Sequence, residues 1–162
     1  MNWAHLHLLS NHLPVIGTLF ALGLLGWGVL RRNDAVQRVA LGTFVVVALL
    51  ALPAYFTGDP AEGAVEHAAG VAESSIAAHE AAALVSLVAA GLVGLVGLVA
   101  LYRGRRGRSL AAPLTALALV MATVTAGLMA WTANLGGAIR HPEIRAVGTP
   151  QAPVHAEEGE GQ

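Results

Sequence analysis

Four long apolar runs constrain this chain more than any other feature. Each contains 18 or more residues without a charged side chain, and they occupy residues 13–30, 39–56, 81–102 and 110–133. A helix needs about 20 apolar residues to cross the hydrocarbon core of a bilayer. Backbone groups in lipid are satisfied only within helices or closed barrels. The runs therefore predict four transmembrane helices, and their short connections favour an all-α polytopic four-helix bundle.

The composition agrees with a membrane protein and excludes several kinds of chemistry. Charged residues make up 12 % of the chain, about half the share of a soluble domain. The absence of cysteine excludes iron–sulfur ligation, thiol catalysis and covalent haem attachment. The net charge of −1 gives no indication of nucleic-acid binding. We expect one transmembrane domain over residues 1–146 and a disordered periplasmic tail over residues 147–162, which is rich in Pro, Glu and Gly.

The arginines predict the orientation of the helices. All nine basic residues are arginine, and seven of them lie in the short connections 31–38 and 103–108. Short loops rich in basic residues face the cytoplasm. We therefore expect a multi-pass protein of the bacterial inner membrane with both termini and the longer connection 57–80 on the periplasmic side.

The connection 57–80 carries the signals of a short amphipathic helix. Asp59 precedes Pro60 and is followed three residues later by Glu62, which is the pattern of a capping box. Gly70 would end this helix. We expect it to lie across the outer mouth of the bundle.

Two further signals predict where the outer ends of the membrane helices lie. Pro14 falls in a first helical turn if the first helix begins near Ser10 or Asn11, where a missing N–H costs little. Asn134, followed by Gly136 and Gly137, is typical of a helix C-terminus and predicts the end of the fourth helix.

Histidines gather at the outer boundary of the predicted bundle. His12, His79 and His141 stand near the start of the first helix, the start of the third and the end of the fourth. Ionisable groups at this depth are costly unless they face the bundle interior, and they often mark function. We predict that His12 and His79 converge on one site, with Glu80, Glu66 or His141 beside them. The candidate haem ligands are His12, His79 and His141, and the candidate metal ligands are His5, His7, His12, Glu66, His67, His79 and Glu80.

These residue types suit either haem b or a transition metal. Imidazole and carboxylate together bind iron, copper(II) or zinc. Haem with two histidine ligands requires imidazoles from different helices that face one gap. The sequence contains no H-E-x-x-H zinc motif, no P-loop and no dinucleotide-binding fingerprint, so it assigns no catalytic residue.

Three stretches resemble a family of small four-helix bacterial membrane proteins catalogued as a domain of unknown function. They are "HLHLLSNHLPVIG" at the first helix, "YFTGDPAEGAVEH" with "GVAESSIAAHEAAAL" between the second and third, and "TANLGGAIRHPEIR" after the fourth. The resemblance covers nearly all of residues 1–146. Relatives of this kind are joined in some bacteria to Rieske or cytochrome c domains. The resemblance therefore implies a membrane redox setting, bound b-type haem and a redox partner of one of these types.

The leading hypothesis is a membrane redox protein, or an anchor subunit, that binds haem b or a metal at a periplasm-facing site and takes part in electron transfer. A periplasm-facing metal sensor or transporter is one alternative, although the four runs offer no charge for a transport path. A structural subunit whose histidines are interfacial anchors is another. In each case the lipid bilayer is a partner, and the chain can form homo- or hetero-oligomers.

Overall fold

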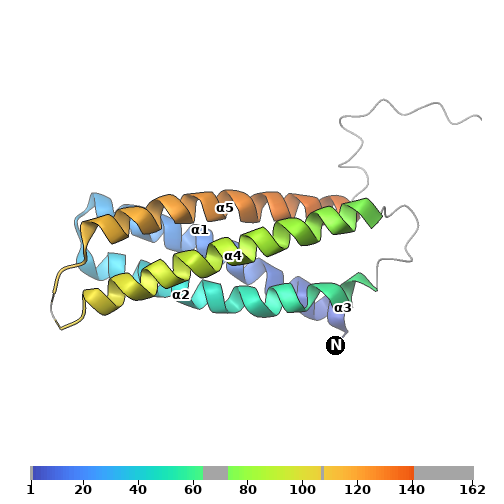
Figure 1. Cartoon of the computed structure of the whole chain (residues 1–162), viewed down its shortest axis with the longest axis horizontal. Helices are drawn as coiled ribbons and strands as arrows, with labels where there is room; N and C mark the ends of the chain where they lie inside the picture. The colour runs from blue at the N-terminus through green and yellow to red at the C-terminus, as the bar shows by residue number, and fades with distance from the viewer. Residues whose placement is uncertain (1, 64–72, 107, 141–162) are drawn as a thin grey trace, which may run out of the picture.

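The computed structural model describes residues 2–63, 73–106 and 108–140 of the chain (Figure 1). In this part, four long helices and one short helix follow one another: α1 (Trp3–Leu30), α2 (Asp34–Phe56), α3 (Gly58–Glu62), α4 (Glu73–Arg103) and α5 (Ala112–Arg140). The four long helices are long and apolar enough to cross a membrane. The predicted fold, a polytopic four-helix bundle with a short helix in the second connection, is confirmed.

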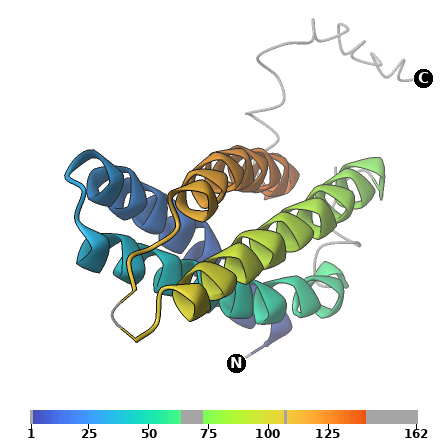
Figure 2. The ribbon, with the colours of Figure 1, turned by 60° about the vertical axis from the view of Figure 1, so that its left-hand side comes forward.

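The helices form a ring in the order α1, α2, α4, α5. Helix α2 packs on both α1 and α4, and α5 packs on α4 and touches α1 less extensively (Figures 1 and 2). The connections 31–33, 104–106 and 108–111 lie together at one end of the bundle, which we call the arginine end (residues 28–38, 102–106 and 108–111). The start of α1, helix α3, the start of α4 and the end of α5 lie at the other, the histidine end (residues 2–14, 53–63, 73–83 and 132–140).

The long helices extend beyond the apolar runs at the histidine end. Helix α1 begins at Trp3, where the Asn2 side chain caps it by accepting a hydrogen bond from the His5 backbone N–H at 2.9 Å. Pro14 therefore lies inside the helix and not in its first turn, contrary to the sequence prediction. Helix α5 likewise continues through Gly136 to Arg140 instead of ending near Asn134. Hydropathy detects only the lipid-covered length of a helix, and polar residues can extend it beyond the hydrocarbon.

Helix α3 is shorter than predicted and begins earlier. It starts at Gly58 after Thr57, so Asp59 lies in its first turn and is not the N-cap. Gly63 follows the last helical residue, Glu62. The predicted helix end at Gly70 lies outside the described residues.

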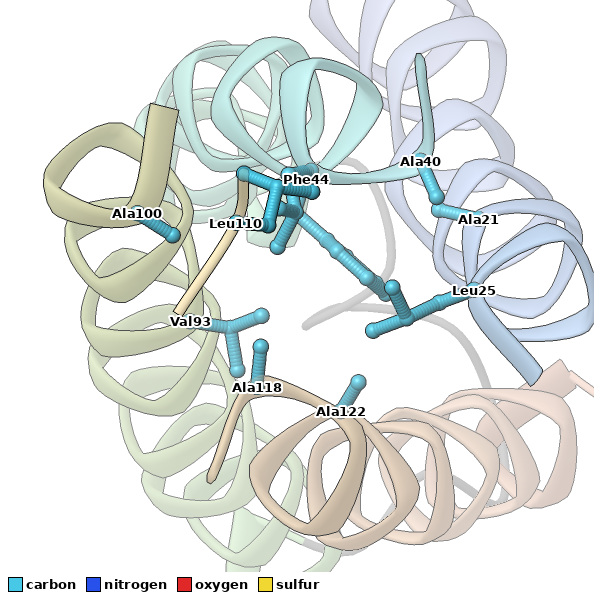
Figure 3. Close-up of a cluster of buried hydrophobic side chains, with 10 residues drawn as sticks. Ala21, Leu25, Ala40, Phe44, Val93, Ala100, Leu110, Ala118 and Ala122 are labelled. Atoms are coloured by element: carbon cyan, nitrogen blue, oxygen red, sulfur yellow. The ribbon is translucent and has the colours of Figure 1, made fainter. Parts of the chain in front are cut away.

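Small residues allow the helices to pack closely. Phe44, Leu25 and Val93 project into the centre of the bundle (Figure 3), and most of the buried side chains around them are alanines: Ala21, Ala40, Ala100, Ala118 and Ala122. A Cβ atom added to Gly97 would lie 2.8 Å from the carbonyl oxygen of Leu41. The backbones of α2 and α4 therefore approach to near contact, as small residues permit in membrane helices.

Large apolar side chains cover the outside of the bundle. Leu30, Phe56 and Phe20 are 80 %, 67 % and 61 % exposed, and similar residues occur along all four long helices. Such an extensive apolar surface indicates an environment of hydrocarbon rather than water. The chain is therefore a multi-pass membrane protein.

A histidine pocket at one end of the bundle

A pocket of about 430 Å³ lies at the histidine end. It combines two imidazoles and two carboxylates with a tyrosine, two alanines and a glycine, and its walls come from α1, α2, α3 and α4: His7, Ala54, Tyr55, Gly58, Asp59, His79, Glu80 and Ala83. Imidazole and carboxylate side chains from three different helices thus line one pocket.

His79 is held by the last turns of α5. Its Nδ1 lies 3.0 Å from the carbonyl oxygen of Thr132. A carbonyl oxygen only accepts hydrogen bonds, so Nδ1 carries the hydrogen and Nε2 of the neutral ring keeps its lone pair. The ring rests against Gly136, where an added Cβ would lie 2.9 Å from the His79 Cε1 atom. The glycine therefore provides the space that this ring occupies.

His7 is held by the end of α2. Its Nδ1 lies 3.2 Å from the Thr57 hydroxyl oxygen, and that hydroxyl donates its own hydrogen to the carbonyl oxygen of Pro53 at 2.7 Å. The hydroxyl oxygen is therefore an acceptor for the Nδ1–H of His7, which again leaves Nε2 with a lone pair. Ser10 donates to the His7 carbonyl oxygen at 3.1 Å and braces the same turn of α1.

The charges around the two rings favour a cationic guest. His7 and His79 both line the pocket, and the nitrogen of a neutral imidazole is an electron-pair donor for a cation. Asp59 and Glu80 add two carboxylates to the wall, and both side chains are exposed. Among the described residues, no three His, Asp or Glu side chains are already gathered closely enough to hold a metal ion. The pocket therefore supplies suitable groups without a preformed cluster of ligands.

Further polar side chains lie deeper in the bundle behind this pocket. The hydroxyl of Thr132 donates to the Leu128 carbonyl oxygen at 2.9 Å and accepts from Ser86 at 2.9 Å. Thr132 thus links α4 to the backbone segment that holds His79. On α1, the side-chain oxygen of Asn11 is buried, and it forms no hydrogen bond within the described part of the chain.

The structure brings together only some of the side chains that the sequence predicted to form the site. His7, His79 and Glu80 share the pocket, but His12 does not line it. His12 is exposed, and its Nδ1 bonds to the Leu8 carbonyl oxygen at 2.7 Å. Residues five apart on a helix point about 140° away from each other, so His7 and His12 cannot both face the pocket. The predicted convergence of His12 with His79 is therefore replaced by a pairing of His7 with His79.

The other predicted ligands do not join this pair in the described structure. His5 is exposed and does not line the pocket. Glu66, His67 and His141 lie outside the described residues, and so does the tail 147–162. Their proposed roles stay predictions.

Sequence reasoning missed the residues that orient the two rings. The connection between the first two runs turns at residues 31–33, 24 residues after His7 and 24 residues before Thr57. Because these runs form an antiparallel hairpin, both residues reach the same level, and this signal could have identified the pair. The sequence predicts that Gly136 helps to end the fourth helix, whereas Gly136 lies within α5 and makes room for His79.

Comparison of the chain with protein-family models, with curated proteins and with solved structures finds no match. The resemblance to the four-helix family stays a prediction, and the pocket has to be judged on its own geometry.

Proposed function

We propose that this membrane protein binds a divalent transition-metal cation in the histidine pocket, with the Nε2 atoms of His7 and His79 as its nitrogen ligands. The observation that carries the proposal is the hydrogen bonding of both Nδ1 atoms to oxygen acceptors. Histidines that bind metals commonly donate the other ring N–H to a carbonyl or a similar acceptor, which fixes the tautomer and the orientation of the ring.

Asp59 and Glu80 supply the negative charge that a divalent cation requires. One of these carboxylates would complete the coordination by rotating toward the two imidazoles, since the described side chains are not yet clustered. A site completed on binding takes up and releases its metal more readily than a rigid cage. Ligands of this kind suit zinc, iron(II), nickel or copper(II).

The residues present fit a metal ion better than haem b. The propionate groups of haem are anionic, and they would meet Asp59 and Glu80 in the pocket wall. His12, which the sequence suggests as a haem ligand, is exposed and does not line the pocket. Haem binding is therefore the less favoured outcome, and an absorption spectrum distinguishes it by a Soret band.

The cellular role proposed for this site is electron transfer at the periplasmic face of a bacterial inner membrane. The arginine distribution supports the orientation, because the arginine end would face the cytoplasm. Iron or copper in the pocket would support redox chemistry, and a Rieske or cytochrome c type protein would be the partner. Transport is less favoured, because the buried polar side chains of the described residues are all uncharged: Thr18, Gln37, Thr57, Ser86, Thr115 and Thr125.

Metal titration of the purified protein tests the proposal. The chain in detergent, after treatment with a chelator, is titrated with zinc(II), copper(II) and iron(II), and the bound metal is measured after equilibrium dialysis. We expect His7→Ala and His79→Ala each to lower affinity at least tenfold, as loss of a ligand should. The control variant His12→Ala removes an exposed imidazole outside the pocket and should bind as the parent does.

Helix content measured by circular dichroism confirms that each variant is folded. Equal metal binding by His7→Ala, His79→Ala and the parent would contradict the proposal. A Soret band that disappears in the same two variants would replace the cation with haem at the same residues. Absorption changes on reduction of the loaded protein would support the electron-transfer role.

A further inference from the structure

The arginine end carries a large positive charge that the chain hardly neutralises. Its only acid is Asp34, whose carboxylate accepts a hydrogen bond from the Leu110 backbone N–H at 3.2 Å and lies 3.6 Å from Arg38. Arg38 also donates to the Arg108 carbonyl oxygen at 2.6 Å. The other arginines of this end have no carboxylate partner in the described structure, and all are exposed: Arg31, Arg32, Arg103, Arg105, Arg106 and Arg108.

Two of these guanidinium groups lie on aromatic rings at the edge of the apolar surface. Arg31 lies 4.5 Å from the centre of the Trp27 ring, and Arg105 lies 3.6 Å from the centre of the Tyr102 ring. Arg105 also donates to the Tyr102 hydroxyl at 2.9 Å. Both rings are more than half exposed, within the last two turns of α1 and α4. Tryptophan and tyrosine at such positions lie at the level of the lipid headgroups.

We infer that the arginine end binds anionic phospholipid headgroups, with Arg31 and Arg105 as the principal phosphate contacts. Guanidinium groups pair with phosphate through charge-assisted hydrogen bonds. The stacked rings hold these two groups at the height where phosphates lie, and the surrounding arginines raise the local anion concentration. The aromatic platforms belong to the lipid-covered surface, which favours a lipid over an acidic protein as the occupant. The inference is independent of the metal site.

Lipid retention by the full chain tests this inference. The purified protein is mixed with phosphatidylglycerol and phosphatidylcholine of identical acyl chains, and the retained lipids are counted by native mass spectrometry. We expect the parent to retain the anionic lipid preferentially. Arg31→Gln and Arg105→Gln should each reduce this preference by about fivefold, the effect of one basic residue near a membrane surface. Arg140→Gln is a charge-matched control, because Arg140 ends α5 at the opposite end of the bundle.

A second measurement uses the parent protein and raises the ionic strength of the solution. At about 1 M ionic strength the Debye length is about 3 Å, so the preference of the parent should largely disappear. Equal retention of both lipids by the parent would overturn the inference, and so would an unchanged preference in the Arg31→Gln/Arg105→Gln double variant. Tight binding of poly-glutamate without any lipid preference would also overturn it and would indicate an acidic protein partner.

Discussion

The hydrogen bonding of inward-facing polar side chains differs between the two ends of the bundle. At the arginine end, Gln37 is buried and donates to the Gly28 carbonyl oxygen at 3.1 Å, and Asp34 and Arg38 tie the start of α2 to the second loop. These side chains bond to backbone groups of the loops and helix ends, as buried polar groups in folded proteins generally do. The contacts of Gln37, Asp34 and Arg38 therefore join the helices and loops of this end.

At the histidine end, several polar groups of the described residues do not use their full hydrogen-bonding capacity. His7 and His79 each use Nδ1 to orient the ring, and the remaining ring nitrogen is the proposed metal ligand. The buried Asn11 oxygen has no partner in the described part, and Pro14 removes an N–H from the interior of α1, which leaves the Ser10 carbonyl without its usual helical partner. Packing of the helices alone does not require such polar groups. The inward-facing polar side chains of the arginine end therefore join helices and loops, whereas those of the histidine end are arranged to bind a ligand.

Among the substitutions that test this difference between the two ends, Gly136→Ala is expected to have the largest effect. Gly136→Ala places a Cβ atom 2.9 Å from the His79 ring, so the ring has to move. Disturbing a group that orients a metal ligand typically costs 10-fold to 100-fold in metal affinity. We expect a loss of this size in equilibrium dialysis with zinc(II) or copper(II).

Gly137→Ala is the matched control, because an added Cβ there meets no atom within 4 Å. Both variants raise the intrinsic helix propensity by up to about 1 kcal/mol, so a difference in affinity between them reflects the pocket alone. Equal affinities in the two variants would show that the position of the His79 ring does not matter for binding.

The second effect concerns Asp34 at the arginine end. Asp34→Ala removes the acceptor for the Leu110 N–H and a negative charge in the first turn of α2. Together these should lower the free energy of unfolding by about 1–2 kcal/mol. The ion pair with Arg38 adds little, because both side chains are about a third or more exposed. Unfolding by titration with sodium dodecyl sulfate in mild detergent measures the change.

Asp59→Ala is the corresponding variant at the histidine end. Asp59 also lies in the first turn of a helix, but it is exposed in the short α3 and should cost less than about 0.5 kcal/mol. If the two aspartates prove equally important for stability, the proposed division between the ends is wrong.

The apolar runs predicted the fold well, but not the pairing of the histidines. All four runs lie almost wholly within the long helices, because the hydrocarbon core demands helical backbone wherever such runs occur. Which histidine of α1 faces the pocket depends instead on the rotation of the helix about its axis. A helix that starts at Trp3 runs through both His7 and His12, and the contact with Thr57 selects His7. That contact joins residues far apart in sequence, and hydropathy does not report it.

A third effect concerns the first loop of the arginine end. Arg32 has a φ angle of 49°, in the left-handed region that favours glycine. The loop forms a Schellman motif there: the Asn33 N–H bonds to the Gly28 carbonyl oxygen at 2.9 Å, and the Arg32 N–H bonds to that of Val29 at 3.1 Å. Glycine normally occupies this position, and the conformation costs other residues about 1 kcal/mol.

Arg32→Gly should therefore raise the free energy of unfolding by up to about 1 kcal/mol, measured in the same detergent titration. Arg31→Gly removes the same charge at a φ angle of −88°, where glycine brings no relief, and it also breaks the contact with Trp27. We expect that variant to be less stable than the parent. If both variants lose stability equally, Arg32 makes a contact that outweighs its backbone strain. If only Arg31→Gly loses stability, Arg32 adopts its left-handed conformation at a cost in stability. Such a cost is expected if the charge of Arg32 has a role at the membrane surface.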